Sequence, residues 1–240
     1  MADVRTPLAK LAPGARTLGE EASSYLCRVR RLREGDRFVA FDPEARTEAD
    51  ATIDEASPAA ARVTIGKLRP AAVVAQVPLV LVYALAKGDK VDAVVRDATE
   101  LGATHIVLAP TARSVVKVDD AKGAAKVDRW RRIAEQAARQ SGRSDPPRVD
   151  LARTFAGALA LADAEAKLLL DPHAADRLGP ALRGKASFAF AVGPEGGFTE
   201  AEIAAARDAG FAPVTLGPFV LRTETVAAAV LGAVRILETP

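Results

Sequence analysis

A glycine-rich turn, Val192-Gly-Pro-Glu-Gly-Gly-Phe198, is the most informative feature of the sequence. It lies between an apolar run and a helix start, and open α/β sheets bind ligands at such turns beyond the carboxyl ends of strands. Glycines let the backbone approach a ligand closely, whereas Pro194 stiffens the turn. The turn has neither the G-x-G-x-x-G fingerprint nor a P-loop lysine, so it does not predict pyrophosphate binding. Taken alone, a tight turn with purely structural glycines is an equal alternative.

A second turn, Leu216-Gly-Pro-Phe-Val-Leu-Arg-Thr-Glu-Thr225, follows the next apolar run. Threonine and glutamate at a helix start are commonly capping residues, and this accounts for Thr223 and Glu224. Arg222 is different, because a cation near a helix N-terminus opposes the helix dipole. Its position indicates a functional group with an anionic partner. We expect the two turns to follow adjacent buried strands and to converge on one ligand pocket.

Two clusters of basic residues are candidates for phosphate contacts. Residues 28–33 contain four arginines, and residues 126–143 add further lysine and arginine. Such clusters are more often solvated faces, which stays the alternative for each. The chain has 33 Lys and Arg against 31 Asp and Glu, a net charge of +2. An anionic partner would therefore be bound by local patches rather than by the bulk charge.

The composition excludes several kinds of site. A single cysteine, Cys27, allows neither a disulfide nor a multi-cysteine zinc site. The two histidines lack ligand spacing, so we predict no metal; His105 is interpreted as structural, and His173 as either a pocket residue or an exposed loop residue. The sequence has no signal-peptide pattern and no apolar run near ~18 residues, which predicts a cytoplasmic protein.

The predicted secondary structure around these residues changes in type near residue 76. Before it, an alternating run at 37–42 and further short runs at 49–54 and 61–68, separated by turn residues, predict hairpins of a small β-barrel, with a short helix at 20–29. After it, apolar strands alternate with helices, which predicts an α/β layer structure with a mostly parallel sheet. The strands are expected at 79–85, 106–109, 166–171, 187–192 and 214–216, and the helices at 91–101, 124–141, 199–210 and 223–237.

Taken together, these blocks resemble a known family. Gly193–Thr199, Leu216-Gly217 and Leu221–Thr225 are similar to motifs of the bacterial 16S ribosomal RNA uracil-N3 methyltransferases of the RsmE type, in the SPOUT superfamily. Upstream, residues 87–92, 98–102 and 130–143 resemble the central blocks of that family in order and spacing. The resemblance covers nearly the whole chain.

The resemblance implies a two-domain enzyme. Residues 1–72 would form a PUA-like β-barrel that binds RNA. Residues 73–240 would form a SPOUT methyltransferase domain with a deep trefoil knot, an exception to the rule that chains are unknotted. It further implies S-adenosylmethionine as methyl donor, no metal, and a homodimer that completes each site. The implied partner is ribosomal RNA within the assembled or nearly assembled small subunit, methylated at N3 of a specific uridine.

Three groups of candidate site residues follow: the first is carried over from the resemblance, and the other two are hypotheses from the basic clusters and from the chemistry of methyl transfer. The cofactor-binding residues would be Leu169, Leu170, Asp171, Pro172, Gly193, Pro194, Glu195, Gly196, Gly197, Leu216, Gly217, Leu221, Arg222, Thr223, Glu224 and Thr225. The RNA-binding residues would be Arg28, Arg30, Arg31, Arg33, Arg139, Gln140 and Arg143. For catalysis, Arg222 or Arg143 is a candidate cation at a uracil carbonyl oxygen. Glu195 or Glu224 is a candidate acceptor of the N3 proton, and Glu195 equally serves to orient its loop or to complement the sulfonium.

Departures from the family pattern leave the substrate open. The segment at Ser24 lacks an expected histidine, Asp97 stands where lysine is usual, and Phe219 replaces a basic or polar residue. These changes concern the RNA contacts more than the cofactor site. The alternatives are a SPOUT methyltransferase for another RNA site, and a non-catalytic RNA-binding factor of ribosome assembly. The presence of both ligand-type turns argues against the second.

Overall fold

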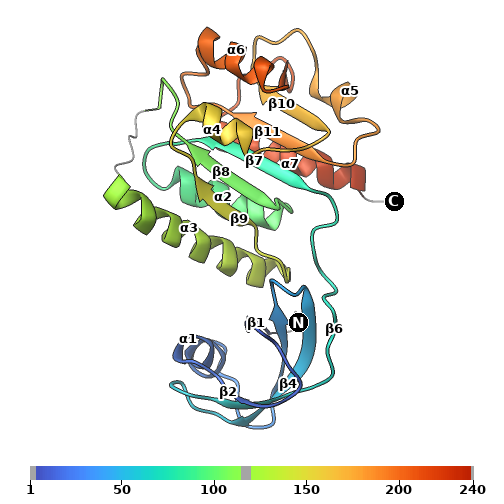
Figure 1. Ribbon diagram of the computed structural model, residues 1–240. Coiled ribbons are helices and arrows are strands. Elements are labelled where there is room, and N and C mark those ends of the chain that lie inside the picture. Colours follow the sequence, from blue (N-terminus) through green and yellow to red (C-terminus); the bar gives the residue numbers. More distant parts are fainter. Residues whose placement is uncertain (1–3, 115–119, 239–240) are drawn as a thin grey trace. The chain divides into compact units, whose positions relative to one another are not determined.

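The computed structural model describes residues 4–114 and 120–238 (Figure 1). Its contacts divide the chain into two compact units. Unit 1 comprises Met1–Val74 together with Ala138–Pro146, and unit 2 comprises Ala75–Ala137 together with Pro147–Pro240. The sequence did not indicate that residues 138–146 group with the N-terminal part.

Unit 1 is built on a six-stranded sheet with the order β1-β3-β4-β5-β2, in which β6 pairs with β4. The strands are β1 (Arg5–Pro7), β2 (Gly14–Thr17), β3 (Arg37–Asp42), β4 (Thr47–Glu55), β5 (Arg62–Ile65) and β6 (Arg69–Pro70). The pairing of β1 with β3 is parallel, and the others are antiparallel. The predicted runs at 37–42 and 49–54 are confirmed, whereas β1 and β2 were not predicted. No ladder joins β1 to β2 within the described residues, so a closed barrel stays a prediction.

The core of unit 1 follows from the alternation of its strands. Along β5, Val63 and Ile65 are buried whereas Arg62 and Thr64 are exposed, as expected for a sheet with one covered face. Leu26 packs into the same cluster from a short helical segment, α1 (Glu20–Ser24) continued by the π-turn η1 (Tyr25–Val29). This confirms the helix predicted at 20–29.

Unit 2 contains a six-stranded sheet in which every strand pairing among the described residues is parallel, with the order β12-β10-β11-β7-β8-β9. The strands are β7 (Leu79–Ala84), β8 (His105–Ala109), β9 (Arg148–Leu151), β10 (Ala166–Leu170), β11 (Phe188–Val192) and β12 (Ala212–Val214). β7 is buried at each position, because a central parallel strand is covered on both faces. The mostly parallel sheet is confirmed. The last strand lies at 212–214 rather than the predicted 214–216.

Helices cover both faces of this sheet (Figure 1). The helices of unit 2 are α2 (Lys90–Glu100), α3 (Asp120–Ser141), α4 (Phe155–Ala160), α5 (Leu178–Leu182), α6 (Glu200–Asp208) and α7 (Thr223–Glu238). Buried side chains of α2, α3, α5 and α7 pack against one face of β7, and those of α4 and α6 pack against the other face. β9, α4 and α5 were not predicted. No described helix has the length and apolarity needed to cross a membrane.

The helix starts and stops follow local chemistry. α6 begins at a capping box, in which the Thr199 side chain accepts from the Glu202 backbone and the Glu202 side chain accepts from the Thr199 backbone, as predicted. Gly102, just after α2, has φ +92°, a left-handed conformation that glycine adopts without a side-chain clash. α6 therefore starts directly after the glycine-rich turn, and its capping fixes where that turn ends.

Candidate functional site

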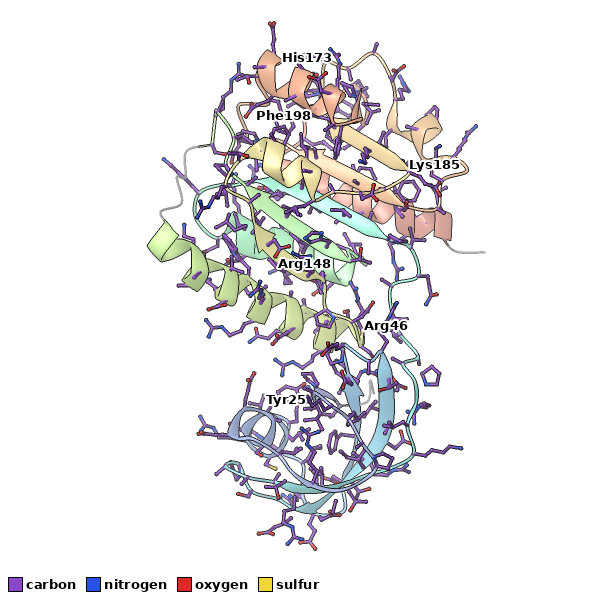
Figure 2. The ribbon with its side chains drawn as sticks, viewed as in Figure 1. Tyr25, Arg46, Arg148, His173, Lys185 and Phe198 are labelled. Atoms are coloured by element: carbon purple, nitrogen blue, oxygen red, sulfur yellow. The ribbon has the colours of Figure 1, made fainter. Side chains whose placement is uncertain are left out.

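A cavity of about 670 Å³ lies at the carboxyl ends of the unit 2 strands. Segments following β8, β10, β11 and β12 bound it, because the carboxyl ends of parallel strands meet at one edge of a sheet. Two of its lining residues, His173 and Phe198, are labelled in Figure 2. The volume is within the range of about 300–1,000 Å³ that is typical of small-molecule sites.

Most of the sequence-predicted cofactor residues line this cavity. They are Leu170, Asp171, Pro172, Gly193, Pro194, Glu195, Gly196, Gly197, Leu216, Leu221, Arg222 and Thr223. The other four predicted positions, Leu169, Gly217, Glu224 and Thr225, are described by the structure but do not line it. Leu169 is buried in the core on the α4 and α6 face, because alternate residues of a strand point to opposite faces.

The two turns meet, but the strands before them are not neighbours in the sheet. β10 lies between β11 and β12. The expectation that the turns follow adjacent strands is therefore wrong in this detail. The segment after β10 completes the cavity between them, with Asp171 Oδ1 accepting from the backbone N–H of His173 at 2.9 Å. His173 is an exposed loop residue and also lines the cavity.

Close packing holds the glycine-rich turn. A Cβ at Gly193 would lie 3.1 Å from the Phe198 ring, and that ring stacks on Phe155 with centroids 4.8 Å apart. The Gly197 N–H donates to the Pro194 carbonyl at 2.8 Å, and Gly197 has φ +69°. A Cβ at Gly193 would thus require the Phe198 ring to shift by a few tenths of an ångström, and the positive φ of Gly197 favours glycine there. The structural interpretation of these glycines is therefore correct, and it coexists with a place in the cavity wall.

Arg113 lines the cavity and was not predicted from the sequence. Its Nη1 donates to the Gly196 carbonyl at 2.6 Å, so it ties the segment after β8 to the glycine-rich turn. The backbone N–H of Ala112 also donates to Glu202 Oε1 at 2.7 Å. The position of Arg113, four residues beyond a buried strand, was the signal that could have found it.

Lys90 is the second missed residue. Its Nζ lies 2.6 Å from Glu195 Oε1 and 3.8 Å from Glu224 Oε2. The hydrogen bond from Lys90 lowers the pKa of Glu195 and raises the pKa of Lys90. The pKa of Glu224 is lowered first by its own backbone N–H at the start of α7. Both candidate proton acceptors are thus carboxylates at neutral pH.

The start of α7 is anchored to the centre of the sheet. The hydroxyl of Tyr83, in β7, lies 2.8 Å from Thr223 Oγ1, and both residues are buried. Burial raises the pKa of Tyr83 to about 12, so this contact is between two neutral hydroxyls. Arg222 precedes the anchor, is exposed and lines the cavity. Next to it, Phe219 and Val220 line the cavity with most of their side-chain surface exposed.

In unit 1, the predicted RNA-contact residues differ in their surroundings. Arg28, Arg30, Arg31 and Arg33 are exposed, and no ion pair involves them in the part of the chain that the structure describes. The Arg139 guanidinium lies over the Tyr25 ring, labelled in Figure 2, at 4.8 Å from its centroid, and Gln140 is exposed. Arg143 is buried, and its Nε donates to Asp145 at 3.1 Å.

The remaining candidates have structural partners. His105 Nε2 lies 2.9 Å from Asp150 Oδ2, as a structural histidine would. Cys27 is partly buried against the unit 1 core. Of the departures, Asp97 pairs with the adjacent Arg96, and Ser24 ends α1. Among the described residues, no group of three or more His, Cys, Asp or Glu side chains is placed to hold a metal ion.

Sequence comparison with protein families gives two matches. The RNA methyltransferase domain family matches residues 74–235, and the RNA methyltransferase PUA domain family matches residues 18–65. The chain is 35% identical to Ribosomal RNA small subunit methyltransferase E of Mycobacterium bovis, over 87% of this chain and 81% of that protein. It is 31% identical to the protein of the same name from Bacillus subtilis, over 93% of this chain and 90% of that one.

Solved structures give the same relationship. The chain is similar to a Legionella pneumophila protein, described as a methyltransferase and solved with its cofactor SAM, with a TM-score of 0.90, 28% identity, and coverage of 99% of this chain and 98% of that one. It is also similar to Ribosomal RNA small subunit methyltransferase E from Neisseria gonorrhoeae bound to S-adenosylmethionine, with a TM-score of 0.88, 29% identity and 98% coverage of both chains.

Proposed function

The chain belongs to the ribosomal RNA small subunit methyltransferase E family, and we propose that it transfers a methyl group from S-adenosylmethionine to N3 of a specific uridine in 16S ribosomal RNA. The observation that carries this proposal is the cavity in which the two predicted turns meet, in a fold similar to relatives solved with that cofactor. We propose N3 of the uracil ring as the atom that is methylated.

The cavity wall fits this cofactor chemically. Leu170, Val192 and Leu216 supply apolar surface of the kind that packs against a purine ring or an aliphatic chain. Glu195 supplies a carboxylate, which complements a sulfonium cation. When bound, S-adenosylmethionine supplies an electrophilic methyl group. We assign its binding to the predicted cofactor residues, with Leu169, Gly217, Glu224 and Thr225 as supports behind the wall.

The contribution of this chain to catalysis is positioning and charge. Transfer forms the bond from N3 to the methyl carbon as the sulfur–methyl bond breaks, and the N3 proton must leave. Arg222, exposed at the cavity, is placed to stabilise negative charge on a uracil carbonyl oxygen. Arg143 is a less suitable cation, since it already donates to Asp145 in unit 1.

Glu195 and Glu224 are the candidate proton acceptors. Both are ionised at neutral pH, so either can accept the N3 proton directly or through water. Glu195 lines the cavity whereas Glu224 does not, which favours Glu195 for a direct transfer. Because Lys90 holds Glu195, that carboxylate is a weak base, and its second role is to complement the positive charge of the cofactor.

The RNA partner follows from the same proposal. We assign residues 1–72 to RNA binding as a PUA-like barrel, and residues 73–240 to catalysis as a SPOUT domain with a trefoil knot. Arg28, Arg30, Arg31 and Arg33 would contact phosphates beside Arg139 and Gln140, and the target base would have to be unpaired or extruded. The acting form would be a homodimer on an assembled or nearly assembled small subunit.

The experiment is an assay with small subunits from a strain that lacks this gene. The purified protein and S-adenosylmethionine should produce 3-methyluridine in the 16S RNA, detected by nucleoside mass spectrometry. Parallel reactions on free 16S RNA, large subunits and transfer RNA test the substrate, and light scattering tests the dimer. A methylated nucleoside other than 3-methyluridine, or methylation of transfer RNA alone, would contradict the proposal.

A further inference from the structure

One ammonium group bridges two of the segments that bound the cavity. Lys90, the first residue of α2, follows β7 and lies 2.6 Å from Glu195 and 3.8 Å from Glu224. Glu195 belongs to the turn after β11, and Glu224 to the first turn of α7. Lys90 does not line the cavity itself, so it acts on a ligand there only through these carboxylates and through its charge.

Among the described residues, the charged groups that line the cavity balance one another, and Lys90 balances Glu224 behind them. The lining contains two cations, Arg113 and Arg222, and two anions, Asp171 and Glu195. Behind the lining, Lys90 adds one positive charge and Glu224 one negative charge. This gives three positive and three negative groups among the described residues that line or adjoin the cavity. Removing Lys90 would leave a net charge of −1 beside the ligand.

These charges are fixed around neutral pH. The hydrogen bond between Lys90 and Glu195 lowers the pKa of the carboxyl and raises the pKa of the ammonium. Glu224, at the start of α7, also has a lowered pKa. Tyr83, which lies near both carboxylates, is kept neutral by a pKa raised to about 12. The charges of Lys90, Glu195 and Glu224 are therefore constant around neutral pH.

The proposed reaction changes the charge of the bound cofactor. When the methyl group leaves, the sulfur keeps the electron pair of the broken bond and the sulfonium becomes a neutral thioether. The N3 proton passes to a carboxylate or to water. S-adenosylmethionine and S-adenosylhomocysteine thus differ by one methyl group and one positive charge, and the local potential acts on that difference.

We propose that Lys90 sets the electrostatic potential of the cavity and thereby its discrimination between S-adenosylmethionine and the product S-adenosylhomocysteine. This inference rests on the proposed function. The ammonium offsets part of the negative charge of Glu195 and Glu224, which would otherwise favour the cationic cofactor. If Lys90 only held Glu195 and Glu224 in place, its loss would change the affinities for the two ligands equally, because the ligands share all their other groups.

The test measures the dissociation constants of both ligands by calorimetry with the full-length protein. The readout is the Kd of S-adenosylhomocysteine divided by the Kd of S-adenosylmethionine. Lys90→Met should raise this ratio about three- to tenfold, the effect expected of a unit charge in partly aqueous surroundings. Glu195→Gln should lower it, the double variant should return close to the wild-type ratio, and Lys90→Arg should keep it.

A matched control removes a lysine from the opposite end of the strands of the same sheet. Lys185 is exposed and precedes β11, so it lies at the amino ends of the strands, as Figure 2 shows. Lys185→Met should leave the ratio unchanged. This control separates a local effect of Lys90 from the loss of any lysine in unit 2.

Some results would overturn the inference. Ratios within twofold of wild type in both Lys90→Met and Glu195→Gln would do so, as would equal weakening of both ligands. If Lys90→Met does not fold, Glu195→Gln decides, because its ratio must fall. An unchanged ratio with a wild type that binds S-adenosylmethionine overturns this inference alone. A wild type that binds neither ligand overturns the proposed function as well.

Discussion

The Tyr83 hydroxyl and Thr223 Oγ1, 140 residues apart in the chain, lie 2.8 Å from each other and are both buried. The contact joins the central strand β7 to the first residue of α7. Thr223 Oγ1 also lies 3.2 Å from Glu224 Oε2. The start of α7, and with it Arg222 and Glu224, is thus tied to a fully buried strand of the sheet.

Removing the Tyr83 hydroxyl should therefore destabilise the protein and loosen the cavity wall. We expect Tyr83→Phe to lower the free energy of unfolding by about 1–2 kcal/mol, the cost of an unmade buried hydrogen bond. Urea denaturation measures it. In a double-mutant cycle with Thr223→Val, the two single effects should not add, because each removes the same contact. Additive effects would show that the two hydroxyls are not coupled.

A methyl group at Gly193 should disturb cofactor binding. The added Cβ would lie 3.1 Å from the Phe198 ring, which is itself held against Phe155. Overpacking of this kind costs about 1–3 kcal/mol, so we expect the Kd of S-adenosylmethionine to rise roughly five- to a hundredfold in Gly193→Ala. Gly179→Ala is the control, since a Cβ there meets no atom within 4 Å. Equal affinity in both variants would remove the turn from the site.

Charge reversal on the exposed arginine cluster should weaken RNA binding. The double variant Arg30→Glu and Arg31→Glu removes two cations that have no ion-pair partner among the described residues. Filter binding to small-subunit RNA should give a lower affinity and a slope of log K against log salt smaller by roughly 1–2. Arg177→Glu with Arg183→Glu, exposed in unit 2, matches the charge change and should have a smaller effect. Equal losses of RNA affinity in the two double variants would indicate that the effect comes from the net charge of the protein alone.

The stability of unit 1 should depend on one buried carboxylate in acid. Burial acts to raise the pKa of Glu48, but hydrogen bonds from Arg5 at 2.5 Å and Arg69 at 3.1 Å outweigh it, and the pKa is lowered. A lowered pKa contributes stability that is complete above the unfolded value of about 4.3 and is lost as the pH falls through the folded value.

The Glu48→Gln variant isolates this contribution. It should be less stable than wild type at pH 7, because Arg5 loses its anionic partner. Between pH 5 and 3 its unfolding free energy should fall less steeply than that of wild type, as measured by urea denaturation at each pH. Parallel curves for the two proteins would contradict the assignment of the lowered pKa to Glu48.

Elements whose signals are local could be predicted from the sequence. The continuous apolar run of β7, the helical spacing of α2 and the capping box at Thr199 each depend on a few neighbouring residues, and the structure confirms all three. The glycine-rich turn and the turn at Arg222 were also recognisable, because glycine and a misplaced cation are unusual in any context. Short elements such as β9 and α4 were missed, since so few residues carry little periodicity.

Which residues share the cavity depends on how the strands are ordered in space, and this could not be predicted from the sequence. Sheet order is non-local, so the sequence could not show that β10 lies between β11 and β12, or that the ends of β7 and β8 bring Lys90 and Arg113 to the same edge. The partners of a charge are equally non-local: Glu195 meets an ammonium 105 residues away. The chain specifies its elements through short-range patterns, whereas the charge of the site arises from contacts that exist only once the sheet has formed.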